Sequence, residues 1–442
     1  MQELFYKETG LYRREFIKGV GWVLLKDAGV LVLTSSAFGC GGATETMLPQ
    51  EGRQSDQEIP SEGYLRLAFN ESPYGPPPAA LTAIEEMLDR PYAMGSEDTH
   101  FLPGINRYPD ALNTQLTKTI ARLHKVKTVN VIPCCGISEL LYMCSQAFLG
   151  TGKNLVMPDA TFPLLRHYAA SRGSAITLVP YTSDYHVDLA ALLDAVGPDT
   201  KLVYLANPDN PTGTVLSFSE IKGFVEAVIT KNSESCVVVD EAYMDYVDLD
   251  PLPEASSLVL KHPVIVGRTF SKAYGMAGLR GGYAVVQKDL SRVLNGFLSG
   301  LLGGEPGWRM FEGDVNRLAG AAIIGGLSPS GQDFVRQVRE QNTMVREMLI
   351  AGLRSLGYGP LESHTNFVLA LMGVDGEHLR NWLCGRKVLV QTGGSFHARY
   401  SDWIRISVGD RSEVETFLEV LAGYDRTSPA SPCFNVFYKG SK

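Results

Sequence analysis

Short apolar runs alternate with segments of helical periodicity from residue 129 onward. The runs predict strands at residues 130–133, 154–157, 175–179, 202–205, 236–239, 264–266 and 282–286. Apolar residues at helical spacing lie between most of these runs, including residues 138–148, 189–195 and 217–230. Apolar strands separated by helices are typical of a sheet covered on both faces. The pattern therefore predicts an α/β fold with a mainly parallel seven-stranded sheet and flanking helices.

The pattern changes on either side of this region. A proline-rich arm at residues 70–78 and helices at 79–88 and 111–123 precede the sheet. After a glycine-rich passage at 300–313, helices are predicted at 315–325, 332–356, 377–384 and 413–423, with strands at 367–371, 388–391 and 403–408. We expect an arm and large domain at 62–310, a smaller α+β domain at 311–425 and a polar tail at 426–442.

The first 42 residues resemble an export signal. Arg13 and Arg14 stand before a moderately apolar stretch, as in twin-arginine signals, and Cys40 lies where a lipoprotein would be processed. Lys26 and Asp27 interrupt the apolar stretch, so an amphipathic helix or weak anchor on a cytoplasmic protein is the alternative. We expect a periplasmic or extracytoplasmic protein, tethered to the membrane if Cys40 carries lipid, with a linker at 43–61.

Composition narrows the class of partner. The chain has 442 residues, 40 basic and 48 acidic, for a net charge of −8, and it contains no long block of like charge. We therefore expect no nucleic-acid partner. The seven cysteines form no CxxC pair and the eight histidines show no metal-ligand spacing, so no metal is expected.

Polar and aromatic residues follow several predicted strands, which matters because ligands of open parallel sheets bind beyond the carboxyl ends of the strands. Asp240 and Tyr243 follow the strand at 236–239, Asn210 lies in a proline-locked turn after 202–205, and Phe162 follows 154–157. Each position also has a purely structural interpretation. Asp240 could be a helix N-cap, Asn210 part of an ordinary turn and Phe162 a core aromatic. A buried carboxylate at position 240, however, requires a cationic partner.

Two further features of the sequence predict a binding site for an anion and a reactive amine. Ile137 and Ser138 begin a helix directly after a strand and a glycine, and free N–H groups at a helix start bind anions. Ser271, Lys272 and Arg280 lie in a glycine-containing stretch after the strand at 264–266. A lysine in a desolvated turn can lose its proton and act as a nucleophile, although the stretch could also be a surface loop.

Six motifs in one order resemble the fold-type I pyridoxal-phosphate enzymes, class I/II aminotransferases, and most closely the histidinol-phosphate aminotransferase branch. They are NESPYG at 70–75, RYPD at 107–110, NPTG at 210–213, DEAY at 240–243, SKA at 271–273 and GLR at 278–280. The likeness spans about residues 64–424.

The resemblance implies a role for each matched residue around the cofactor ring. Lys272 is implied to form the Schiff base with pyridoxal 5'-phosphate and to move the substrate proton. Asp240 is implied to keep the pyridine nitrogen protonated. Asn210 and Tyr243 are implied to hydrogen-bond the ring oxygen, and Phe162 to stack on the ring.

The resemblance also implies how the cofactor phosphate is held. Ser271, Arg280 and the backbone of Ile137 and Ser138 are implied to bind it within one subunit. Tyr108 is implied to reach the phosphate bound by a neighbouring subunit. We therefore expect a homodimer.

The substrate side departs from the family pattern. Arg405 resembles the arginine that binds the substrate carboxylate, and Tyr74 is expected to contact the substrate. Histidinol-phosphate enzymes typically have an arginine where this chain has Gln391, and Lys387 and Arg399, the alternative cations, do not match that position. We therefore expect an aminotransferase acting on an amino acid and a 2-oxo acid, not on histidinol phosphate. The alternatives are a C–S lyase, decarboxylase or amino-acid oxidase on the same fold, or a cofactor-binding protein without turnover.

Overall fold

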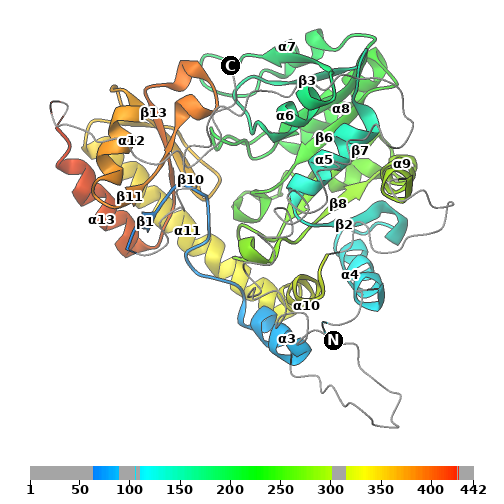
Figure 1. The fold of residues 1–442 in the computed structure, drawn as a ribbon, viewed down its shortest axis with the longest axis horizontal. Helices are drawn as coiled ribbons and strands as arrows, with labels where there is room; N and C mark the ends of the chain where they lie inside the picture. Colours follow the sequence, from blue (N-terminus) through cyan, green and yellow to red (C-terminus); the bar gives the residue numbers. More distant parts are fainter. Residues whose placement is uncertain (1–62, 89–104, 106–109, 301–314, 426, 428–442) are drawn as a thin grey trace, which may run out of the picture. The chain divides into compact units, whose positions relative to one another are not determined.

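Seven strands form the central sheet, in the order β2-β8-β7-β6-β5-β3-β4. Their bounds are Val131–Cys134 (β2), Asn154–Pro158 (β3), Ala175–Val179 (β4), Thr200–Ala206 (β5), Cys236–Asp240 (β6), Val264–Thr269 (β7) and Gly282–Val286 (β8). Only β8 runs antiparallel to its neighbours, β2 and β7. The predicted seven-stranded, mainly parallel sheet is confirmed (Figure 1).

This computed structural model describes residues 63–88, 105, 110–300, 315–425 and 427. The predicted export signal with Cys40, the linker, Tyr108, most of the glycine-rich passage and nearly all of the tail lie outside the described residues. Residues Ile59–Lys442 form one compact unit. The boundary predicted near residue 310 between a large and a small domain stays a prediction.

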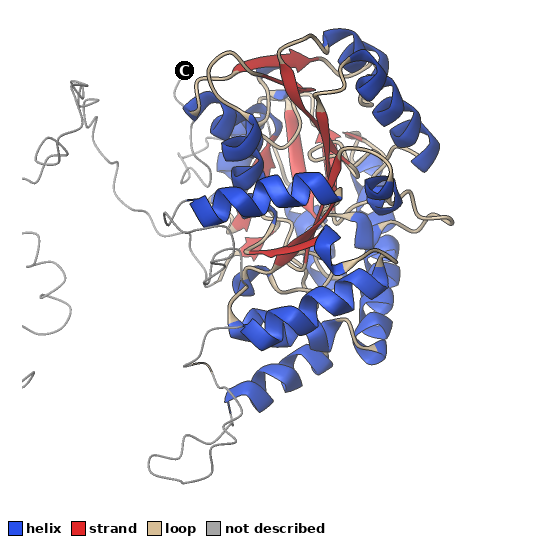
Figure 2. Ribbon diagram, turned by 90° about the vertical axis from the view of Figure 1, so that its right-hand side faces the viewer, coloured by secondary structure: helices blue, strands red, loops and turns tan. Residues whose placement is uncertain are grey.

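Alternating side chains of the strands build two separate apolar layers. On β6, Val237 and Val239 belong to one core and Cys236 and Val238 to the other, because successive strand residues point to opposite faces. The first core is completed by helices α4 (Asp110–Leu123), α7 (Leu189–Ala195) and α8 (Phe218–Lys231). The second is completed by α5 (Ile137–Phe148), α6 (Leu164–Ser171) and α9 (Lys288–Gly300). Figure 2 shows helices on both sides of the strands.

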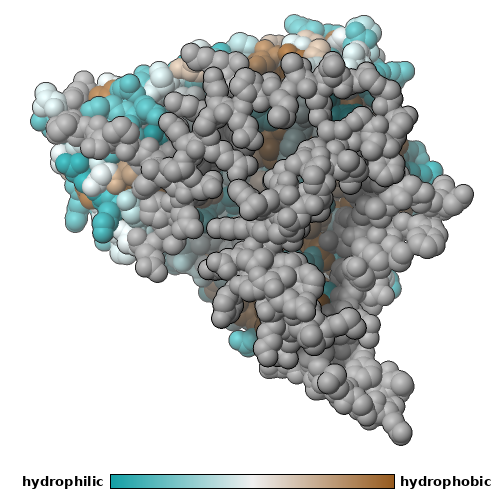
Figure 3. Space-filling view, in the orientation of Figure 1, coloured by the Kyte–Doolittle hydropathy of each residue, from teal (hydrophilic) through white to brown (hydrophobic). Residues whose placement is uncertain are grey.

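A four-stranded sheet of order β12-β13-β10-β9 follows along the chain. Its strands are Gly359–Pro360 (β9), Phe367–Leu371 (β10), Gln391–Thr392 (β12) and Trp403–Ser407 (β13). Helices α11 (Pro329–Ser355), α12 (Gly376–Cys384) and α13 (Arg411–Ala422) supply its apolar partners. Hydrophilic residues (teal) gather over the α12 and α13 edge in Figure 3, as expected for helices that bury only one face.

The single strand predicted at 388–391 divides into two. Val388–Leu389 (β11) pairs in parallel with Leu65–Arg66 (β1), whereas β12 pairs with β13. Val390 separates the two pieces and is buried. A two-residue strand has too short a pattern to be recognised from sequence, so β1 and this division were not predicted.

Helix α3 (Pro78–Leu88) lies along α10 (Arg317–Gly326). A Cβ at Gly325 would lie 2.3 Å from the carbonyl oxygen of Ala79, so glycine permits this close approach. Among the helices in the described ranges, none is both long and apolar enough to cross a membrane.

Candidate active site

A cavity of about 180 Å³ lies at the carboxyl ends of β5, β6 and β7. The predicted residues among those that line it are Ile137, Ser138, Phe162, Asn210, Asp240, Tyr243, Ser271, Lys272 and Arg280. These side chains come from segments that span more than 140 positions of the sequence, and the parallel strand order brings them to one edge. The structure therefore places the predicted cofactor residues around a single cavity.

Lys272 enters the cavity from the turn that follows β7. Its Nζ donates a hydrogen bond to the carbonyl oxygen of Phe69 at 3.1 Å and lies 5.7 Å from the centre of the Tyr243 ring. Desolvation, and next the nearby positive charge of Arg405, lowers the pKa of Lys272 from 10.5 to about 8. An amine with this pKa is partly unprotonated near neutral pH, as a nucleophile or base requires.

A close backbone contact holds the lysine turn against the N-terminal arm. Gly275 has φ +64°, and a Cβ there would lie 2.2 Å from the carbonyl oxygen of Gly75. Only glycine allows this conformation and this contact together. The arm and the lysine turn are therefore packed directly against each other.

Asp240 is the last residue of β6 and is 5% exposed. Its Oδ2 accepts a hydrogen bond from the Tyr204 hydroxyl at 2.9 Å, and Oδ1 accepts one from the Ala242 amide at 3.1 Å. Burial raises the pKa of Asp240 from 3.8 to about 6. A carboxylate in this environment favours a cationic partner, which the protonated nitrogen of a pyridine ring would supply.

The opposite end of the cavity suits a phosphate. Helix α5 begins there, and its N-cap residue is Gly136, with φ 83°. No side chain caps the helix, so its first N–H groups stay available at the end of the cavity that Ser138 lines. A Cβ at Gly136 would stand 3.1 Å from Nη2 of Arg280, so the arginine lies close to the start of the helix, and the φ of +83° favours glycine there. Thr269 Oγ1 donates to Ser271 Oγ at 3.1 Å and so adds a hydroxyl pair. This donor set fits the phosphate of pyridoxal phosphate.

Donors between these two ends suit the ring oxygen. Asn70 Nδ2 donates to the Tyr243 hydroxyl at 2.9 Å, so the tyrosine hydrogen stays available for another acceptor. Arg405 Nη1 donates to Oδ1 of Asn210 at 2.7 Å, which leaves the Asn210 amide hydrogens without a partner among the described residues. Both side chains can therefore donate to one oxygen in the cavity, as predicted.

Arg405 lies on β13 beside the cavity and is 4% exposed. Within the described residues its guanidinium donates to two acceptors, Oδ1 of Asn210 and the carbonyl oxygen of Ala68, the latter at 2.7 Å. Its Nε has no hydrogen-bond acceptor among these residues. Burial lowers the pKa of Arg405 to about 10, so the side chain remains a cation at neutral pH. Its unused donors fit a substrate carboxylate.

None of the three predicted substrate residues lines this cavity, and within the described residues only Arg405 of the three contacts a residue that does, Asn210. Tyr74 is half-buried on the arm, where burial and then Asp410 raise its pKa. Gln391 lies opposite Arg405 in the β12–β13 pair, is 5% exposed and hydrogen-bonds the Ser395 hydroxyl. Tyr108 lies outside the described residues, so its predicted contact across subunits stays a prediction.

Two residues that support the cavity were not predicted. Asn70 holds Tyr243, and it belongs to a motif that was recognised without a role for its first residue. Tyr204 holds Asp240 from the adjacent strand β5. A tyrosine within an otherwise apolar strand next to a strand-end carboxylate is a signal that could have identified Tyr204.

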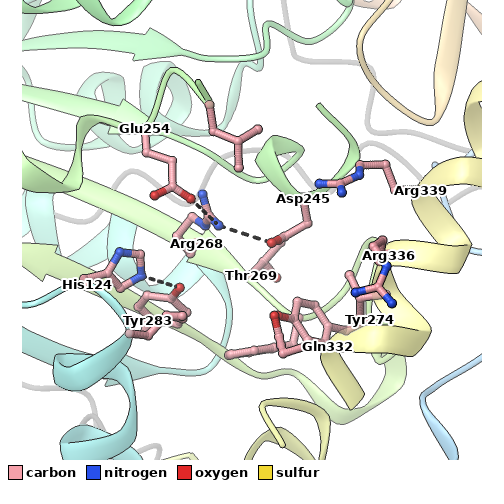
Figure 4. Close-up of a pocket in the computed structure, with 14 residues that line it drawn as sticks. His124, Asp245, Glu254, Arg268, Thr269, Tyr274, Tyr283, Gln332, Arg336 and Arg339 are labelled. Atoms are coloured by element: carbon pink, nitrogen blue, oxygen red, sulfur yellow. Dashed lines mark hydrogen bonds and ion pairs between the residues drawn. The ribbon is translucent and has the colours of Figure 1, made fainter. Parts of the chain in front are cut away.

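A larger cavity, of about 300 Å³, lies apart from this chemistry and shares only Thr269 with it (Figure 4). Arg268, 6% exposed on β7, contacts Glu241 at 3.0 Å, Asp245 at 3.1 Å and Glu254 at 3.3 Å. Glu241 follows Asp240, and Arg268 precedes Lys272 by four residues. These ion pairs join β6 and β7 close in sequence to Asp240 and Lys272, so we assign them a structural role.

Comparisons with known proteins agree with this geometry. Residues 62–421 match the family described as aminotransferase class I and II. The histidinol-phosphate aminotransferase of Shouchella clausii is 33% identical to this chain, over 82% of this chain and 90% of that protein. The histidinol-phosphate aminotransferase of Moorella thermoacetica is 32% identical, over 83% of this chain and 86% of that protein. The crystal structure of histidinol-phosphate aminotransferase from Sinorhizobium meliloti, in complex with pyridoxal-5'-phosphate, has a TM-score of 0.68 and 28% identity, covering 81% of this chain and 89% of that chain.

These relatives contradict one prediction. We expected a substrate other than histidinol phosphate because Gln391 replaces an arginine, yet the relatives named above are histidinol-phosphate aminotransferases. The prediction was wrong because it took the missing arginine at position 391 as evidence against a phosphorylated substrate. A phosphate requires a cation at the right place in space, and residues distant in sequence can supply it.

The other predictions that the comparisons test agree with them. The α/β fold, the aminotransferase class of enzyme and the pyridoxal-phosphate cofactor are confirmed. The chain belongs to the class I and II aminotransferase family.

Proposed function

We propose that this protein is a pyridoxal-phosphate-dependent histidinol-phosphate aminotransferase. It exchanges the amino group of histidinol phosphate with the oxo group of a 2-oxo acid. The observation that carries the proposal is the placement of Lys272 and Asp240 in one cavity, with Arg405 hydrogen-bonded to Asn210 of the same cavity. The relatives named above, of similar length, support the choice of substrate.

Pyridoxal phosphate, when bound, supplies the electron sink that stabilises negative charge at the substrate Cα. Asp240 holds a proton on the ring nitrogen, because its buried carboxylate favours a cation beside it. Tyr243 and Asn210 orient the ring through their free donors. Phe162 covers one ring face.

Lys272 is the residue that moves the proton. With pyridoxal phosphate bound, its Nζ would accept and return the proton at the substrate Cα. Its pKa of about 8 keeps this exchange close to balanced near neutral pH. Arg405 binds the carboxylate of the amino acid and 2-oxo acid pair.

The proposal extends to assembly and location. A homodimer is supported by the RYPD motif, which the family resemblance places at the neighbouring subunit's cofactor. Export is supported by the paired arginines and the apolar stretch before Cys40.

Turnover with defined substrates tests the proposed function. Purified protein loaded with pyridoxal phosphate should convert histidinol phosphate and 2-oxoglutarate to glutamate, measured by chromatography. Lys272→Ala should lower kcat at least about a thousandfold, because both the covalent attachment and the proton carrier are lost. Tyr142→Phe, on the exposed side of α5, is the matched control and should retain full activity.

Two results would overturn the proposed function. One is the absence of glutamate formation from histidinol phosphate when another amino donor is used readily. The other is release of ammonia or carbon dioxide in place of amino transfer.

A further inference from the structure

Tyr204 is a polar residue in the apolar part of strand β5. It lies between Val203 and Leu205, and all three side chains are fully buried. A phenylalanine would fill the same space without a hydroxyl group that needs a partner. The reason for a tyrosine at this position therefore lies in what its hydroxyl contacts.

The pairing of β5 with β6 directs this hydroxyl to Asp240. Tyr204 is paired with Val238, so Asp240 lies two residues further along the neighbouring strand and on the same face of the sheet. The Tyr204 hydroxyl donates to Oδ2 of Asp240 at 2.9 Å. The register of the two strands therefore fixes the contact.

The Asp240 carboxylate accepts one further hydrogen bond within the described residues. The Ala242 amide donates to its Oδ1 at 3.1 Å. A backbone amide is present at this position for any residue except proline, so this bond does not depend on the side chain at 242. Tyr204 is therefore the side chain that decides how strongly hydrogen bonds stabilise the ionised carboxylate.

Burial and the Tyr204 hydroxyl act in opposite directions on the pKa of Asp240. Burial has the largest effect and raises this pKa, whereas the hydrogen bond from Tyr204 has the next largest and lowers it. The Ala242 amide and the charge of Lys272 also lower it, and the charge of Asp209 raises it. Burial and then Asp240 hold the pKa of Tyr204 itself well above its usual value, so the hydroxyl keeps its hydrogen and remains a donor.

This balance matters because Asp240 and the ring nitrogen of pyridoxal phosphate would share one proton. A shared proton stays on the stronger base, and burial alone makes a carboxylate a stronger base. A hydrogen bond donated to the carboxylate makes it a weaker base, so the proton remains on the nitrogen. A protonated ring is the better electron sink.

We propose that Tyr204 is a positioning residue that keeps the proton on the ring nitrogen of bound pyridoxal phosphate by donating a hydrogen bond to Asp240. The inference rests on the proposed role of Asp240 beside that nitrogen. Without the hydroxyl, the proton would move toward the carboxylate. The competing explanation is that the hydroxyl only satisfies its own need for a buried acceptor.

Nitrogen NMR of the holoenzyme locates the proton directly. Wild type, Tyr204→Phe and Asp240→Asn are loaded with pyridoxal phosphate that carries ¹⁵N in the ring and are compared near neutral pH. The wild-type signal should lie at the position of a protonated pyridine, and the Asp240→Asn signal at that of a neutral one. The Tyr204→Phe signal should move from the first toward the second, because the ratio of protonated to neutral nitrogen falls about tenfold when one hydrogen bond to a charged group is lost.

Cofactor-free protein gives a second, independent measurement. The infrared carbonyl band of the protonated carboxyl group, assigned by its loss in Asp240→Asn, follows the ionisation of Asp240 with pH. The midpoint should rise by about one pH unit in Tyr204→Phe. Tyr204→3-fluorotyrosine, whose hydroxyl is a stronger donor, should lower the midpoint, which a defect in packing would not do.

Tyr283→Phe is the matched control, because it removes another buried tyrosine hydroxyl from the same sheet. Tyr283 lies on β8 in the other apolar layer, and its hydroxyl is 2.8 Å from Nε2 of His124. This variant should leave both the ¹⁵N signal and the infrared midpoint unchanged.

The outcomes separate the inference from the proposed function. An unchanged ¹⁵N signal or an unchanged midpoint in Tyr204→Phe would overturn the inference, and so would equal shifts in Tyr204→Phe and Tyr283→Phe. A neutral ring nitrogen in the wild type would overturn the proposed role of Asp240, and the inference with it. Neither measurement uses histidinol phosphate, so the proposed substrate stands or falls separately, by turnover.

Discussion

At the scale of single residues, Asp240 carries a stability cost that the cofactor removes. Its pKa rises from 3.8 to about 6 on folding, so it favours folding at low pH and loses that contribution as pH rises through 6. In cofactor-free protein, Asp240→Asn should therefore gain about 1 kcal/mol relative to wild type when pH rises from 5 to 8. Urea unfolding at both pH values measures this difference. The expectation fails if the difference is independent of pH or has the opposite sign.

At the scale of elements, the lysine turn depends on its contact with the arm. Gly275→Ala places a Cβ within 2.2 Å of the Gly75 carbonyl oxygen at φ +64°, so the turn must move. We expect a loss of at least about 2 kcal/mol of stability. The affinity for pyridoxal phosphate should fall at least about tenfold. Thermal melting and cofactor titration measure the two effects. Gly278→Ala is the control in the same stretch, since no atom lies within 4 Å of its Cβ position, and it should change stability by less than about 0.5 kcal/mol. Equal effects of both substitutions would contradict this explanation.

At the scale of the whole molecule, the described site residues belong to the unit Ile59–Lys442, whereas the proposed dimer would need a second copy. A chain that starts at Ile59 should keep kcat within about twofold of the full chain, because the described site residues lie beyond that point. Light scattering should give this shorter chain twice its own subunit mass. A fully active monomer would exclude the predicted contribution of Tyr108 across subunits. Fractionation of cells that produce the full chain should recover it outside the cytoplasm, whereas recovery only in the cytoplasm would contradict export.

Local patterns were sufficient for most of the fold. Strands and helices of ordinary length have a hydrophobic period that can be read directly, and β4, β8 and α7 match the predicted bounds. The cofactor residues were also predictable, because residues at the carboxyl ends of parallel strands meet at one edge. Lys272 and Asp240 follow this rule.

Contacts between distant segments were not predictable in the same way. The pairing of β1 with β11 involves only two residues on each strand, and the Tyr204 and Asn70 contacts depend on which strands and loops are neighbours. The substrate prediction failed at Gln391 for the same reason.

The sequence by itself determined the family, the sheet and most of the residues that line the cavity, because each is encoded by a local motif or a short periodic pattern. Only the tertiary structure decided which charged and polar residues from distant parts of the chain contact one another. It brings Arg399 to Asp159 across 240 positions of the chain and occupies Gln391 with Ser395. Electrostatic recognition depends on distances between charges in space, which a one-dimensional pattern does not specify.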